Sequence, residues 1–116
     1  MSDGITKRSL GDDKILIDPG KTLDNSNAGD MLEILNSALM NGVKFAILDM
    51  ANLELLSSAG VGALLGTLEA FRDEGGDIVL CNIPDKILHV LQVLDLAEFM
   101  TIKADVKRAE VSCRKG

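Results

Sequence analysis

The chain has 116 residues, 47% of them hydrophobic, and a formal net charge of −6 at pH 7. This length fits one domain, the hydrophobic fraction excludes a disordered chain, and no apolar run approaches the ~18–20 residues of a membrane span. The acidic balance argues against a nucleic-acid partner, because phosphate backbones require clustered Lys and Arg. With three Phe and no Tyr or Trp, the chain also lacks an aromatic platform for stacking bases or sugars.

The polar N-terminus and the two cysteines indicate the cellular compartment. Residues 1–4, Met-Ser-Asp-Gly, lack the apolar stretch of a signal peptide, which predicts a cytoplasmic protein. Cys81 lies in an apolar segment and Cys113 near the C-terminal end, and two such separated cysteines are typical of reduced thiols. The sequence therefore predicts neither a disulfide nor a metal site.

The chain opens with the pattern of a β-hairpin. Residues 5–10 and 14–18 are predicted strands, and residues 11–13, Gly-Asp-Asp, form the turn between them. A helix follows, with Asn25 or Ser26 as its predicted N-cap. Its apolar residues recur at spacings of three and four and form one stripe: Ala28, Met31, Leu32, Leu35, Ala38 and Leu39.

The first helix ends at residues 41–42, Asn-Gly, which suit the left-handed C-terminal position. A predicted strand at residues 44–50 comes next. The turn at Ser57 and Ser58 then leads into a second helix that runs to about Asp73. Its apolar residues again form one stripe: Val61, Leu64, Leu65, Leu68 and Phe71.

The last third of the chain alternates once more between strand and helix. Residues 77–81 form a buried strand, and Pro84 suits the first turn of a third helix. A short strand at 99–102 and a helical turn at 105–111 complete the pattern. The residues predicted to point inward from the third helix are Ile87, Leu88, Leu91 and Leu94.

Together these elements predict an α/β fold. Strands that alternate with helices require a largely parallel sheet joined by right-handed crossovers. We expect a single domain over residues 1–116, with a short sheet of four or five strands, an opening hairpin and about four helices.

The turn at Ser57 and Ser58 is the strongest candidate site. It lies where a strand meets a helix N-terminus, which leaves backbone N–H groups unpaired and carries partial positive charge. Such a position favours an anion. A serine there is left bare, acts as a nucleophile, or is phosphorylated.

A catalytic role for this turn lacks the necessary residues. The only histidine, His89, falls within the third helix and is read as an ordinary surface or packing residue, so the serines have no adjacent base. The first glycine of the Gly-x-Ser-x-Gly elbow is missing, and the glycines from Gly60 onward do not have the spacing of a nucleotide-binding loop. Gly62 and Gly66 are instead predicted to permit close packing of the helix against a strand. The sequence thus predicts no enzyme, cofactor or bound metal.

Three residues of this region also have purely structural interpretations. Ser58 is a candidate helix cap, a role that is compatible with phosphorylation. Asp24 is a candidate turn or capping residue. Asp49 is expected to end its strand and to bond the loop that follows.

The combined pattern resembles the STAS domain, which comprises the anti-sigma factor antagonists and the cytoplasmic tails of sulfate transporters. The resemblance spans about residues 5–112 and rests on the order of elements, on Leu23-Asp24 before the first helix, and on Asp49 ahead of the serine turn. Its most specific part is the strand, the turn and the helix that carry Ser57, Ser58, Ala59, Gly60, Val61 and Gly62. A stand-alone domain of this length is similar to the antagonist branch.

That resemblance implies a function and a set of residues. In the antagonist branch, a kinase-type anti-sigma factor phosphorylates the serine two positions before the first glycine, which is Ser58 here. Ser57 stands where the family usually has Asp, and Ala59 where it has Ser or Thr. The residues implied to contact the partner are Asp24, Asn25, Ser57, Ser58, Ala59, Gly60, Val61 and Gly62.

The expected protein is therefore a cytoplasmic, non-enzymatic anti-sigma factor antagonist that phosphorylation of Ser58 switches off. We expect it to bind a kinase-type anti-sigma factor but neither nucleic acid nor the membrane interior, and to be a monomer or weak dimer when free. Two alternatives stay open. One is a STAS subunit of another assembly, such as a lipid-transport complex or a stress-signalling scaffold, without phospho-switching. The other is a small anion- or nucleotide-binding domain.

Overall fold

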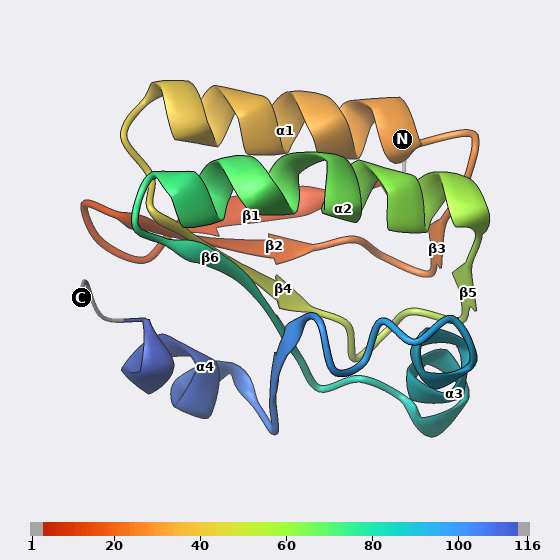
Figure 1. The fold of residues 1–116 in the computed structure, drawn as a ribbon. Coiled ribbons are helices and arrows are strands. Elements are labelled where there is room, and N and C mark those ends of the chain that lie inside the picture. Colours follow the sequence, from red (N-terminus) through yellow and green to blue (C-terminus); the bar gives the residue numbers. More distant parts are fainter. Residues whose placement is uncertain (1–3, 114–116) are drawn as a thin grey trace.

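The protein folds as a five-stranded sheet with helices packed against it (Figure 1). The computed structural model describes residues 4–113, so the first three residues, which belong to the polar N-terminus, lie outside the described residues. The elements in chain order are β1 (Thr6–Ser9), β2 (Lys14–Asp18), β3 (Thr22–Leu23), α1 (Ala28–Met40), β4 (Phe45–Asp49), β5 (Leu55–Leu56), α2 (Ser58–Asp73), β6 (Asp77–Cys81), α3 (Asp85–Val93), β7 (Thr101–Lys103) and α4 (Val106–Ser112).

The sheet confirms the predicted α/β architecture. Its strand order is β1-β2-β4-β6-β7; β1 pairs with β2 in the antiparallel sense, and the remaining neighbours are parallel. The opening hairpin turns at Gly11, whose φ of +125° suits glycine. A second, two-stranded parallel sheet joins β3 to β5 outside the main one.

Both faces of the main sheet are covered. Helices α1 and α2 lie side by side on one face, α4 lies on the other, and α3 lies at the edge toward which the parallel strands run (Figure 1). Because helices cover both faces, the first four residues of β4 are all buried. None of the helices within residues 4–113 combines the length and the apolar character that a membrane span requires.

Two apolar clusters hold these layers together. Beneath α1 and α2, side chains such as Leu35, Leu64 and Phe71 are at most 1% exposed and pack on the sheet. On the opposite face, Cys81 of β6 and Cys113, just after α4, belong to a smaller cluster. The periodic stripes of α1 and α2 thus predicted the core correctly.

Some details differ from the sequence expectations. The N-cap of α1 is Asn27, neither Asn25 nor Ser26. Leu94, predicted to point inward, is 49% exposed, because α3 ends at Val93 and the chain turns at Asp95 with φ of +59°.

The last strand also starts later than expected, at Thr101 rather than at residue 99. The preceding residues, Phe99 and Met100, close a turn by donating their N–H groups to the carbonyl oxygen of Leu96.

The buried thiols make stability sensitive to alkaline pH. Burial raises the pKa of Cys81 from 9.0 to about 12 and that of Cys113 to about 11, so the folded state holds both protons more tightly than the unfolded chain. This stabilisation is complete below pH 9. It is lost as the pH rises from the thiol pKa of the unfolded chain to the thiol pKa of the folded protein. We therefore expect the free energy of unfolding, measured with urea, to fall from about pH 9 upward. In a Cys81→Ala, Cys113→Ala variant the free energy of unfolding should fall less steeply with pH. A fall as steep as that of the wild type would contradict the attribution of the pH dependence to these two thiols.

Candidate functional site

The two adjacent serines have different structural roles. Ser57 is the N-cap of α2: its backbone is extended, and its Oγ accepts a hydrogen bond from the N–H of Gly60 at 3.4 Å. Ser58 is the first residue of the helix and is exposed. Within residues 4–113 no group hydrogen-bonds its hydroxyl. The capping role expected of Ser58 was therefore wrong, and Ser57 takes that role.

The start of α2 is fixed by a backbone contact with Leu23. Strands β3 and β5 pair Leu23 with Leu56, and the N–H of Ser57 donates to the carbonyl oxygen of Leu23 at 3.0 Å. A Cβ on Gly60 would lie 2.5 Å from the same oxygen. Only glycine therefore lets α2 approach β3 so closely.

This pairing brings the loop after β3 to the serine turn. Asp24 follows Leu23 directly, and its Oδ1 accepts from the hydroxyl of Ser26 at 2.6 Å and from its N–H at 2.9 Å. These two bonds hold the pKa of Asp24 below its ordinary value, so the carboxylate is charged at neutral pH.

Asn27 locks the same loop from the other side. Its amide donates to the carbonyl oxygen of Thr22 at 2.9 Å, and its Oδ1 accepts from the N–H of Asp24 at 2.9 Å. Sequence reasoning missed this role; the available signal was an Asp and an Asn three positions apart immediately before a helix.

Asp49 and His89 have the structural roles expected of them. Asp49 ends β4, and its Oδ1 accepts from the N–H of Ala51 and from the amide of Asn82, both at 3.1 Å. His89 is exposed on α3. In the described part of the chain, no three His, Cys, Asp or Glu side chains are grouped so as to hold a metal ion.

The residues expected to contact a partner divide by exposure. Asn25, Ser58 and Gly62 are exposed at this end of the molecule. Asp24, Ser57 and Ala59 are half-buried. The remaining two, Gly60 and Val61, are buried and support the surface from beneath.

Gly62 and Gly66 do not pack against a strand, contrary to the sequence expectation. A Cβ on Gly62 would meet nothing within 4 Å, and one on Gly66 would meet only Leu32 Cδ2 at 4.0 Å. Both lie four positions apart on the exposed side of α2, in line with Ser58. The closely packed glycine of α2 is Gly60 instead, because the first turn of the helix lies against the backbone of Leu23 in β3.

This arrangement is chemically suited to carrying a phosphoryl group. The first N–H groups of α2 lack intrahelical acceptors, and no acidic residue lies in the first turn of the helix. A dianion on Ser58 Oγ would sit at the positive end of the helix dipole.

Comparison with known proteins agrees with this fold. Residues 6–109 match the family model described as the STAS domain. The chain belongs to the STAS domain family. BtrV of Bordetella bronchiseptica, named as an anti-sigma factor antagonist, is 28% identical to this STAS domain over 80 residues, which are 69% of this chain and 66% of that protein.

Two solved structures share the architecture of this STAS domain. The anti-sigma factor antagonist SpoIIAA in its unphosphorylated form has a TM-score of 0.81 at 18% identity, covering 93% of this chain and 95% of that one. The phosphorylated form of the Bacillus cell fate determinant SpoIIAA has a TM-score of 0.74 at 18% identity, covering 93% and 98%. At this identity the likeness concerns the fold.

We expect alanine substitutions at the tightly packed Gly60 and at the open Gly62 to have opposite effects on stability. Gly60→Ala places a methyl group against the carbonyl oxygen of Leu23, and we expect it to lower the free energy of unfolding by about 1–3 kcal/mol. Gly62→Ala adds a methyl group in open space within a helix and should raise that free energy by about 1 kcal/mol. Urea unfolding of the two variants measures both. Equal effects would contradict the placement of α2 against Leu23.

Proposed function

We propose that this STAS domain is an anti-sigma factor antagonist. It binds a kinase-type anti-sigma factor through the surface around the start of α2, and phosphorylation of Ser58 by that kinase releases the complex. It acts in the cytoplasm and performs no catalysis of its own.

The observation that carries this proposal is the free hydroxyl of Ser58. Because Ser57 caps the helix, Ser58 is not needed for the fold and stands exposed at the helix N-terminus. A kinase can therefore reach and modify its Oγ without breaking any contact within the described chain. Ser57 shows the opposite combination, since it is half-buried and already bonded to Gly60.

The electrostatics of the turn support a switch that acts on binding and not on folding. A phosphate on Ser58 adds about −1.5 to −2 charges at neutral pH. The helix N-terminus stabilises negative charge by roughly 0.3–1 kcal/mol, so the modified domain stays folded. The charged Asp24 lies in the neighbouring loop, and a phosphate beside it makes a surface that an acidic or apolar partner rejects.

The relatives support the same assignment. BtrV and SpoIIAA are both named as anti-sigma factor antagonists. SpoIIAA keeps a STAS fold in a phosphorylated form, which is what a switch without unfolding requires.

The test combines phosphorylation with binding. The chain is incubated with ATP and each purified serine-kinase anti-sigma factor of the source genome, and modified residues are mapped by mass spectrometry. We expect one kinase to modify Ser58 alone. In the presence of ADP this kinase should bind the wild type and Ser58→Ala, whereas Ser58→Glu should bind at least about tenfold more weakly, because interfacial like charges cost several kcal/mol.

Ser37→Glu provides the matched control, because it adds the same charge at an exposed serine of α1. It should bind like the wild type, and both Glu variants should unfold at temperatures close to that of the wild type. Modification at Ser57, or a Ser58→Glu variant that binds normally, would contradict the proposed switch. Binding to no kinase would remove the proposed partner altogether.

A further inference from the structure

Phe99 is an aromatic side chain on the surface of a chain that has few aromatics. The other two Phe residues, Phe45 and Phe71, are 4% and 0% exposed in the core. Phe99 is 54% exposed, in the loop between α3 and β7. Aromatic side chains at surfaces contribute strongly to protein interfaces, because they bury a large area with little loss of rotamer freedom.

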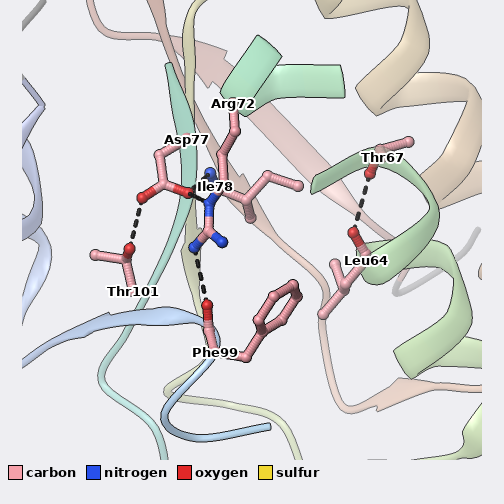
Figure 2. A network of polar contacts seen from close by, with 7 residues as sticks. All are labelled: Leu64, Thr67, Arg72, Asp77, Ile78, Phe99 and Thr101. Carbon is pink, nitrogen blue, oxygen red and sulfur yellow. Dashed lines mark hydrogen bonds and ion pairs between the residues drawn. The ribbon is translucent and has the colours of Figure 1, made fainter. Parts of the chain in front are cut away.

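The loop around this ring is held in place by Arg72, in the last turn of α2 (Figure 2). The Nη2 group of Arg72 donates to the carbonyl oxygen of Phe99 at 2.9 Å, and its guanidinium lies 5.2 Å from the ring centroid. Its Nε donates to Asp77 Oδ1 at 3.0 Å, while Asp77 Oδ2 accepts from the hydroxyl of Thr101. The exposed ring is therefore preorganised, so a partner that covers it does not have to order the loop.

The ring forms one side of an apolar groove beside α2. The groove has a volume of about 460 Å³, and its lining residues are Leu65, Leu68, Glu69, Arg72 and Phe99. Three of its five lining residues, Leu65, Leu68 and Phe99, are apolar. This shape and chemistry suit an apolar side chain inserted from another molecule.

Carboxylates in the groove lining and in the loop of Phe99 indicate what kind of partner the groove suits. Glu69 lies in its lining, and the exposed Asp95 and Glu98 lie in the loop that carries Phe99. The one cation of the lining, Arg72, is paired with Asp77. A second copy of this chain would bring the same carboxylates together on a molecule whose net charge is already −6. These carboxylates therefore favour a different partner, one whose surface is basic where it meets the groove, whatever its charge near Ser58.

The groove and the serine turn lie along the same helix, α2. Leu65 lies seven residues after Ser58, about 10 Å along the helix axis. Gly62 and Gly66, on the exposed side of the same stretch, have no side chains that would hold a partner away. A standard interface buries about 800 Å² on each side, which is enough for one partner to cover both places.

We propose that this groove receives an apolar side chain, flanked by Lys or Arg, of the same protein that Ser58 controls. Phe99 is then a second contact with that partner, in addition to the serine turn, and phosphorylation of Ser58 does not change it. This inference rests on the proposed function and deepens it.

The test uses the kinase that modifies Ser58 in the experiment above. Phe99→Ala should weaken its binding at least about tenfold, as for an interface hot spot. The KM for phosphorylation of Ser58 should rise by the same factor with kcat unchanged, because the anchor lies away from the reacting hydroxyl. Phe99→Leu, which keeps an apolar side chain, should recover most of the affinity. A Phe99→Leu variant as weak as Phe99→Ala would overturn the proposal.

Two matched controls separate the groove from general surface effects. Met40→Ala removes an 87% exposed apolar side chain at the end of α1, and binding should be unchanged. Glu69→Lys should weaken binding and reduce its dependence on salt, whereas Glu33→Lys, the same change at an exposed residue of α1, should do neither. Equal effects of test and control variants would overturn the proposal.

The remaining outcomes distinguish this inference from the function on which it rests. If Ser58→Glu abolishes binding of the kinase but Phe99→Ala binds it as tightly as the wild type does, the groove proposal fails and the proposed function stands. If no kinase binds the wild type, both fail. Self-association of the isolated chain that is lost in Phe99→Ala would assign the groove to a second copy and overturn the proposal.

Discussion

The contact between the backbone of Leu23 and the first turn of α2 is the constraint on which the site depends. The carbonyl oxygen of Leu23 receives the N–H of Ser57, and the absent side chain of Gly60 leaves room for the same oxygen. One hydrogen bond of this kind stabilises by only about 0.5–1.5 kcal/mol. Its importance is geometric, because it fixes where α2 begins and therefore which of two neighbouring serines is exposed. It also brings the loop of Asp24 beside the serine turn.

The sequence predicted the parts of this fold in which one periodic pattern spans many residues. The stripes of α1 and α2 and the apolar runs of β4 and β6 depend on burial, which hydrophobic periodicity reports directly. The two-residue strands β3 and β5 have no period to detect, so the pairing of Leu23 with Leu56 was not predictable from the sequence. That pairing sets the start of α2 and the close approach of its first turn to Leu23, so both the predicted cap, Ser58, and the predicted closely packed glycines, Gly62 and Gly66, were wrong.

The errors at the helix ends have the same physical origin. Ser57 and Ser58 are equally good caps by residue type, and so are Asn25, Ser26 and Asn27. At α2 the choice is made by a tertiary contact that local sequence does not contain, the bond from the N–H of Ser57 to the carbonyl oxygen of Leu23. At α1 the start coincides with local bonds of the Asn27 side chain to the backbone of Thr22 and Asp24, which residue type alone does not distinguish from a cap at Asn25 or Ser26. The family resemblance correctly favoured the STAS fold because it depends on the order of whole elements and not on single caps.

The composition of α2 indicates that its exposed side is shaped by something outside the domain. Gly62 and Gly66 each cost about 1 kcal/mol relative to Ala in a helix interior, and neither gains a contact within the described chain. Their stability cost would be removed by alanine without any steric conflict, so the fold alone does not explain them. A partner backbone that lies flat on this side, as the proposed function requires, would explain them, because a Cβ there would hold it away. On that proposal, the free serine at one end of α2 and the preorganised phenylalanine near the other belong to a single binding surface, in which Ser58 is modified and Phe99 is not.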